Sequence, residues 1–194
     1  MLEIASPLSG LAMTGGISMP ITIRKAQGKD AAALGHIQVT SWRSAFRDIA
    51  SDEYLDQMVN EEHQANDWKD IIADPEQVVY VAELNGESVG YAWAHREDDE
   101  AIDWDSELIS MHILPDYKRM GLGRRLFAAT ARDLHEQGCE SVYLWVLEQN
   151  QPSRKFYEAL GGEPAGEHQI ELGDRMLTEV AYGWKVIDQL EKFQ

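Results

Sequence analysis

The sequence has one cysteine, few prolines and no long apolar run. Cys139 cannot form an intrachain disulfide, and no CxxC or Cys/His ligand cluster is present, which excludes a disulfide scaffold and a structural zinc site. No apolar run approaches the roughly 18 residues of a membrane span, and the first 19 residues lack the basic start of a signal peptide. These absences predict a cytoplasmic protein with no metal and no membrane partner.

Cationic residues are also scarce. Seventeen Lys and Arg stand against 34 Asp and Glu, giving a formal net charge of −17. This charge argues against a nucleic-acid or anionic-membrane partner and admits cationic or neutral substrates more easily. A chain of 194 residues that is 44% hydrophobic suits one domain with a real core. We expect a loose leader over residues 1–19 and a single domain over 20–194, as a monomer or homodimer.

The apolar periodicity predicts a mixed α/β fold. A hairpin is the clearest element, because Asn85-Gly86 between two β-rich runs tolerates the positive φ of a tight turn. Asp30 is expected to cap the first helix. A βαβ crossover from Leu108 to Val146 adds one parallel strand pair. The expected strands are 21–26, 108–114 and 141–146, the hairpins 78–95 and 168–184, and the helical segments 31–46, 52–59, 61–72, 121–138 and 152–160.

The basic residues are concentrated in one place. The stretch from Lys118 to Arg125 holds four of them, where a strand ends, a glycine-containing turn follows and a helix begins. Free backbone N–H groups and the positive end of the helix dipole converge there on an anion. Gly121 and Gly123 allow close approach of the backbone to phosphate oxygens. The pattern predicts a phosphate or pyrophosphate site, but Leu126 replaces the third glycine of the dinucleotide fingerprint and no Walker pattern exists.

Two linked stretches, "ELISMHILPDYKRMGLGRRLF" and "LWVLEQNQPSRKFYEALGG", resemble the GCN5-related N-acetyltransferase (GNAT) family. The family's signature Q/R-x-x-G-x-G/A falls on Lys118, Gly121 and Gly123. The downstream pattern falls on Asn150, Ser153, Phe156, Tyr157, Glu158, Leu160 and Gly161. The resemblance implies a central twisted, mostly antiparallel sheet with one parallel pair, flanked by helices. Lys118 departs from the pattern, since it offers a point charge where Gln or Arg offers a planar group.

The resemblance also implies acetyl-CoA as cosubstrate. The amides of residues 119–124 would hold its pyrophosphate, its pantetheine would run like an extra strand along 108–114, and Asn150 would hydrogen-bond it. The implied cofactor-binding residues are Met111, His112, Ile113, Lys118, Arg119, Met120, Gly121, Leu122, Gly123, Arg124, Asn150, Ser153 and Phe156.

The chemistry requires a base, because an alkylamine with a pKa near ~10.4 must lose a proton to attack a thioester. Glu107 is the first candidate, since its position eleven residues before Lys118 looks like that of the family's glutamate base. His112 is the rival, and Asp103 or Asp105 could act through a water. Tyr157 is the candidate acid for the CoA thiolate. Backbone N–H groups from Met111 to Ile113 would stabilise the oxyanion, and direct attack needs no covalent enzyme intermediate.

The acceptor is expected to be a primary amine of a small molecule or peptide. Trp42, Arg43 and Phe46 occupy the helical region that usually walls the acceptor site in the resembled family. Arg43 would favour acceptors with a carboxylate, whereas the acidic stretch from Glu97 to Glu107 favours polyamines, aminoglycosides or lysines. Two alternatives stay open: a non-catalytic acyl-CoA sensor, and an acyltransferase for another acyl chain or a hydroxyl acceptor.

Overall fold

The computed structural model describes residues 20–46, 61–97, 103–172 and 175–193. The elements are β1 (Ile21–Lys25), η1 (Gly28–Asp30), α1 (Ala31–Phe46), α3 (Glu61–Ala73), β2 (Gln77–Leu84), β3 (Glu87–Arg96), β4 (Ser106–Ile113), η2 (Pro115–Tyr117), α4 (Leu122–Glu136), β5 (Val142–Leu147), α5 (Gln151–Ala159), β6 (Glu163–Leu172), β7 (Arg175–Trp184) and η3 (Ile187–Phe193). The helical region expected over residues 52–59 lies outside the described residues.

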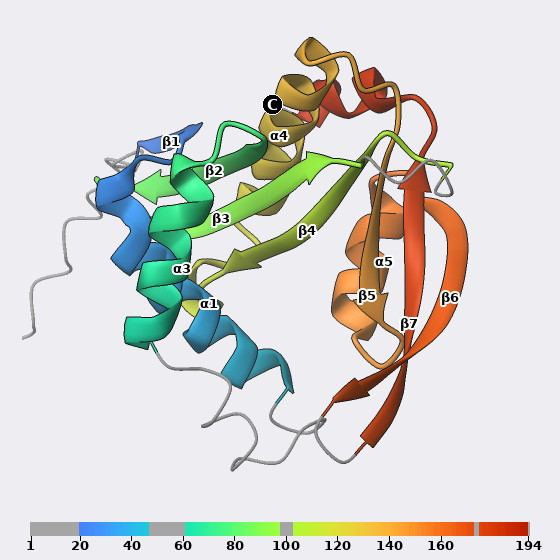
Figure 1. The fold of residues 1–194 in the computed structure, drawn as a ribbon, viewed down its shortest axis with the longest axis horizontal. Coiled ribbons are helices and arrows are strands. Elements are labelled where there is room, and N and C mark those ends of the chain that lie inside the picture. The colour runs from blue at the N-terminus through green and yellow to red at the C-terminus, as the bar shows by residue number, and fades with distance from the viewer. Residues whose placement is uncertain (1–19, 47–60, 98–102, 173–174, 194) are drawn as a thin grey trace, which may run out of the picture.

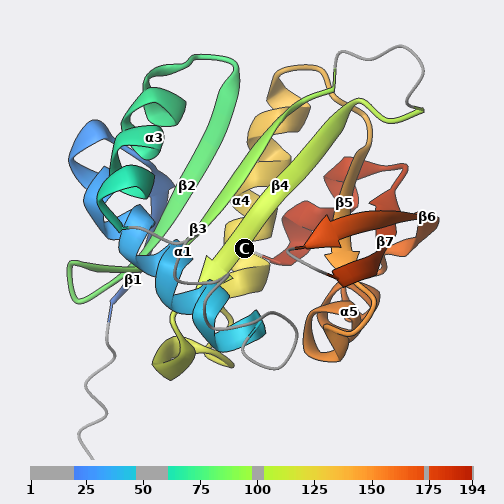
Figure 2. The same ribbon diagram turned by 60° about the horizontal axis from the view of Figure 1, so that its bottom comes forward.

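The strands form one sheet in the order β1-β2-β3-β4-β5-β7-β6. All neighbours are antiparallel except β4 and β5, which are joined through α4 by the crossover. Figures 1 and 2 show α1 and α3 on one face of the sheet and α4 on the other. The expected mixed α/β fold, mostly antiparallel with one parallel pair, is confirmed.

The β2–β3 hairpin turns at the expected dipeptide. Asn85 has φ 55° and Gly86 has φ 84°, so both central residues are left-handed, as a type I′ turn requires. The turn fixes the register that pairs Val79 with Trp93 and Val81 with Tyr91. These paired residues point to the same face of the sheet, and α3 covers them.

Two cores bury the two faces of the sheet. The larger core packs α4, α5 and η3 on one face, with Phe127, Leu144 and Trp184 at most 2% exposed. The smaller core lies under α1 and α3 and centres on Trp68 and Tyr91, whose rings are 4.7 Å apart in an edge-to-face arrangement. Each fully buried large side chain contributes roughly 1.5–3 kcal/mol. Because both faces are covered, β2 is apolar nearly throughout.

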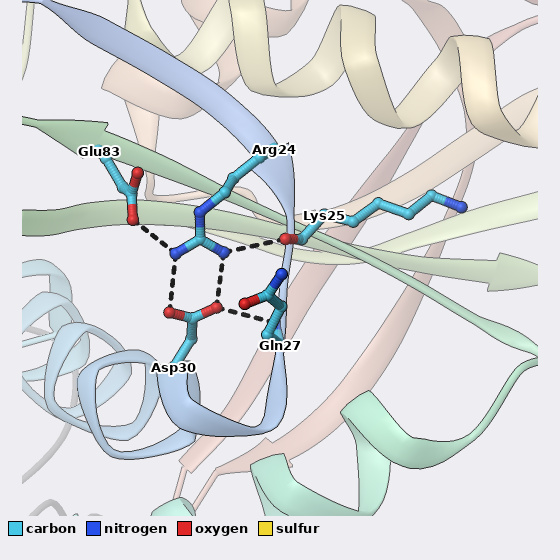
Figure 3. A network of polar contacts seen from close by, with 5 residues as sticks. All are labelled: Arg24, Lys25, Gln27, Asp30 and Glu83. Atoms are coloured by element: carbon cyan, nitrogen blue, oxygen red, sulfur yellow. Dashed lines mark hydrogen bonds and ion pairs between the residues drawn. The ribbon is translucent and has the colours of Figure 1, made fainter. Parts of the chain in front are cut away.

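The start of the first helical segment differs from the expectation. Asp30 is the last residue of η1 and not the N-cap; Gln27 holds that position and donates its backbone N–H to Asp30 Oδ2 at 2.8 Å. The same carboxylate also binds Arg24, through two nitrogens at 2.7 and 2.9 Å, and Arg24 binds Glu83. Figure 3 shows this network, which fastens the start of α1 to β1 and β2.

Among the described residues, no helix is both long and apolar enough to cross a membrane.

Candidate active site

The first residues of β4 and β5 are fastened to one another. Asp105 Oδ2 accepts hydrogen bonds from the backbone N–H groups of Glu140 and Ser141 and from the Ser141 hydroxyl, at 2.8 to 3.1 Å. Ser106 Oγ donates to the Ser141 carbonyl at 2.7 Å from a fully buried position. These bonds hold the two parallel strands together at one end.

Beyond that end the strands separate. Glu107 and Tyr143 form the one residue pair between β4 and β5 in the described chain. Figure 1 shows the strands diverging from there, while β4 stays paired with β3 along its other edge. From Leu108 onward, the β5-facing edge of β4 therefore has no partner strand among the described residues. This is the edge along which the resemblance places the pantetheine.

The turn after β4 has the backbone of an anion site. Arg119 has φ 67° and Gly121 has φ 82°, so two left-handed residues curl the chain immediately before α4 begins at Leu122. Alternating right- and left-handed residues direct successive N–H groups inward, and the first N–H groups of the helix have no intrahelical partner. The geometry fits the diphosphate expected for residues 118–124. Lys118, Arg119, Met120 and Arg124 are exposed, whereas Leu122 is buried and anchors the turn.

Gly123 brings three elements together. A Cβ added there would lie 3.1 Å from Phe156 Cζ of α5 and 3.3 Å from Ile113 Cδ1 of β4. The beginning of α4, the end of β4 and α5 therefore meet without space for a larger residue. Three of the expected cofactor-binding residues are neighbours in consequence.

Asn150 caps a helix in addition to its expected hydrogen bond to pantetheine. It is the N-cap of α5, and its Oδ1 accepts from the Ser153 backbone N–H at 3.3 Å. The cap uses the carbonyl oxygen and not the amide nitrogen. The nitrogen is therefore the group with which Asn150 would donate to pantetheine.

Tyr157 lies on the α4 side of the sheet. It is 8% exposed and packs against the rings of Phe156 and Trp184. Burial raises the pKa of its phenol above the ordinary 10, so Tyr157 is protonated at neutral pH. A general acid must be in this state.

Glu107 lies on the opposite face because of a β-bulge. Trp93 pairs with Ser110 and Ala94 pairs with Leu108, so Ile109 has no opposite residue. Strict alternation counted back from His112 would turn Glu107 towards α4. The extra residue turns it instead to the α1 and α3 face, beside His95.

The carboxylate of Glu107 belongs to a polar group drawn from three strands. The Tyr143 hydroxyl is 3.2 Å from Glu107 Oε2 and 3.1 Å from Glu97 Oε2, and His95 Nε2 is 3.8 Å from the same Glu107 oxygen. One ligand atom from each of His95, Glu97 and Glu107 lies within 4.8 Å of the others. These atoms could accommodate a small cation. Sequence reasoning selected Glu107 and included Glu97 in the acidic stretch, but it missed His95 and Tyr143.

The surroundings of Glu107 move its pKa upward. Burial is the largest cause, the Glu97 and Glu179 charges add to it, and the Tyr143 hydrogen bond and His95 oppose it. The upward direction brings a carboxylate closer to the pKa of a useful base near neutral pH.

The rival bases have other positions. Burial, together with the Lys118 charge, lowers the pKa of His112 to about 4, which makes it a weak proton acceptor. Its ring packs edge-on against Tyr91 at 5.5 Å. Asp103 pairs with Lys185 at 2.8 Å, and Asp105 fastens the strands as described above. Glu107 is the best placed of the four.

The acceptor-wall residues lie in the last turns of α1. The Ser41 hydroxyl bonds the Ile113 carbonyl at 3.5 Å, which places this end of α1 beside the end of β4. Trp42 is half-buried and Arg43 is exposed. Phe46 ends the helix, and its side chain is outside the described part of the structure. A role for these three residues stays a prediction.

The fold and the basic turn of residues 118–124, called the cradle from here on, define an acyl-CoA-dependent acetyltransferase, and comparison with known proteins agrees. Residues 39–162 match the model of the Acetyltransferase (GNAT) family. The chain belongs to this family: it is an N-acetyltransferase with acetyl-CoA as cosubstrate.

The similar proteins are also named as acetyltransferases. The uncharacterized N-acetyltransferase YuaI of Bacillus subtilis (strain 168) is 32% identical over 172 residues, covering 88% of this chain and 96% of YuaI. PaiA N-acetyltransferase of Thermoplasma acidophilum, solved with coenzyme A, aligns with a TM-score of 0.68 at 20% identity, over 83% of this chain and 98% of that one. The yncA protein of Salmonella typhimurium, solved with acetyl-CoA, aligns with a TM-score of 0.66 at 21% identity, over 85% and 93%. The two solved structures share the fold.

Proposed function

We propose that the chain acetylates a primary amine of a small molecule or peptide by direct attack in a ternary complex, with Glu107 as general base and Tyr157 as general acid. The observation that carries the proposal is the position of these two side chains. They lie on opposite faces of the sheet, Glu107 beside His95 and Tyr157 in the α4-side core, and β4 and β5 part between them.

The backbone and the charge of the cradle suit the diphosphate of acetyl-CoA. Two left-handed residues, Arg119 and Gly121, precede the helix, and basic side chains surround them. When bound with its diphosphate there, acetyl-CoA supplies the thioester carbonyl. The N–H groups of β4 from Met111 to Ile113 would then serve both the pantetheine amides and the developing oxyanion.

Glu107 and Tyr157, on opposite faces of the sheet, would carry out the proton transfers. Glu107 accepts a proton from the ammonium, and the nitrogen lone pair forms the new C–N bond at the thioester carbon. The attached nitrogen loses its second proton to water as the C–S bond breaks, which leaves a neutral amide. Tyr157 donates its hydroxyl proton to the departing sulfur and regains one from water. Glu107 returns its proton to solvent. The sequence of transfers balances without a metal or covalent adduct.

The test is a pair of isosteric variants, Glu107→Gln and Tyr157→Phe, assayed for thiol release from acetyl-CoA with a panel of amines. We expect kcat to fall about 10²-fold or more in each variant. The coenzyme A dissociation constant should stay within about twofold, since neither side chain touches the cradle. Unchanged turnover in both variants would remove the assignment of acid and base and would favour the sensor alternative.

A further inference from the structure

One hydroxyl is shared by two carboxylates in the polar group around Glu107. The Tyr143 hydroxyl lies between Glu97 Oε2 and Glu107 Oε2, at 3.1 and 3.2 Å. A hydroxyl carries one proton, so it can donate to one of these carboxylates at a time. The other carboxylate faces the hydroxyl oxygen without a proton between them.

His95 adds a third polar atom to the same place. Its Nε2 is buried and has no hydrogen-bond partner among the described residues. It points to the Glu107 carboxylate at 3.8 Å, too far for a hydrogen bond. Nε2 can accept a hydrogen bond from an incoming N–H group when the ring proton is on Nδ1.

A primary ammonium group has the complementary chemistry. It brings three N–H donors and one positive charge. Acceptors that each contact a tetrahedral cation at about 2.9 Å are themselves about 4.7 Å apart. The ligand atoms of His95, Glu97 and Glu107 all lie within 4.8 Å of one another. The spacing of these three atoms is of the size that one ammonium requires.

The surroundings also favour a cation. The rings of Trp104 and Trp145 lie 6.0 and 6.3 Å from the ring of Tyr143. Trp104 already binds a cation, since Lys185 Nζ lies 4.0 Å over its ring, and His168 stacks on Trp145. Aromatic faces attract cations, and exclusion of water strengthens the attraction. Glu179 adds a further negative charge close enough to act on Glu107.

We propose that His95, Glu97 and Tyr143 are specificity-determining residues of the acceptor site, which bind the acceptor as its ammonium and select alkylamines over neutral arylamines. The proposal rests on the proposed function, because Glu107 must take the proton from the ammonium that the other three residues hold. It assigns separate tasks to the two carboxylates. Glu97 binds the charge, and Glu107 removes the proton.

The test compares acceptors of similar shape but different charge. Benzylamine, cyclohexylamine and butane-1,4-diamine are cationic at pH 7.5, whereas aniline is neutral. In Glu97→Gln the ratio of kcat/KM for benzylamine to that for aniline should fall about tenfold to hundredfold, because a charge-assisted contact is lost. Tyr143→Phe should lower the ratio less, and Glu97→Asp should restore part of it. Glu87→Gln is the matched control: it removes the same charge from the exposed start of β3, the strand that ends one residue before Glu97, and the ratio should stay at the wild-type value.

Calorimetry supplies a readout independent of turnover. Wild-type protein saturated with coenzyme A should bind benzylamine more tightly than aniline, and Glu97→Gln should lose this preference. Equal losses for both amines in Glu97→Gln would indicate a structural role and overturn the proposal. Failure of the wild type to bind any of the three alkylamines would overturn it as well, as would tight Zn²⁺ binding that the amines cannot displace.

The assignment of Glu107 as the base and the proposal of an ammonium site can be refuted independently. Full turnover in Glu107→Gln would refute Glu107 as the base, whereas the selectivity ratio in Glu97→Gln would still decide whether the ammonium is held here.

Discussion

Replacing Gly121 with alanine tests the cradle most directly. Gly121 has φ 82° and is the N-cap of α4. An alanine Cβ there would meet the Arg124 guanidinium at 3.4 Å, an ordinary contact, so the side chain itself fits. The cost is conformational, because an L-residue in the left-handed region loses roughly 1–2 kcal/mol relative to glycine.

That cost should appear in coenzyme A affinity. In the free protein the exposed turn can leave the left-handed region, and binding must then restore it. A penalty of roughly 1–2 kcal/mol corresponds to a dissociation constant about fivefold to thirtyfold higher. Titration calorimetry with coenzyme A measures this change, and thermal unfolding measures any loss of stability.

Gly138 provides a control at the opposite end of the same helix. It has φ 93°, and a Cβ there would meet nothing within 4 Å. Gly138→Ala should therefore lower stability by a similar amount and leave coenzyme A affinity unchanged. Wild-type affinity in Gly121→Ala, or equal weakening in both variants, would refute the idea that the main chain of this turn grips the diphosphate.

Three further predictions concern titration and stability. Glu107→Gln should abolish the acidic limb of the rate profile, because Glu107 must be ionised to act and its pKa is raised by burial. The same variant should be more stable than the wild type at pH 7. Because the native pKa of Glu107 is raised, ionisation of Glu107 destabilises the folded wild type as the pH rises through that pKa. Calorimetry at several pH values should show that the difference in stability vanishes in acid. Tyr157→Phe should lower kcat and leave CoA affinity unchanged, and it should not alter the rate profile below pH 9, since the Tyr157 pKa is raised above 10. Asp30→Ala should lower the free energy of unfolding by about 2 kcal/mol, because it removes charge-assisted hydrogen bonds to Arg24. Arg24 lowers the Asp30 pKa below its ordinary 3.8. The stabilisation by Asp30 should therefore be complete above pH 3.8 and should be lost as the pH falls through the lowered pKa. Urea titrations at pH 6 and pH 2 measure the difference.

Local chemistry made much of the fold predictable. The Asn85-Gly86 turn, the stop at Gly138 and the glycine turn before α4 each depend on a few adjacent residues, and each occurs where expected. The expected position of Asp30 was wrong: it is the N3 residue of a capping box whose N-cap is Gln27. The sequence signal for capping was present, but the helical segment begins one short 3-10 turn earlier, and the carboxylate also binds Arg24 of β1.

The acceptor side could be predicted only in part. Glu107 was found by its distance from Lys118, yet its face depends on the bulge at Ile109, which no local residue pattern marks. His95 and Tyr143 become its neighbours through pairing of three strands, and they are 12 and 36 residues away along the chain. Because such contacts depend on register across the sheet, periodicity within one segment does not reveal them.

In the described chain one residue pair joins β4 and β5, so the sheet consists of two panels, β1–β4 and β5–β7, held together by this pair, the polar bonds of Asp105 and Ser106, and a helical crossover. We expect backbone amides on the open interior edge of β4 to exchange with solvent faster than amides bonded between paired strands. Occupation by a linear ligand would slow exchange on both panels together and make the whole sheet unfold as one unit.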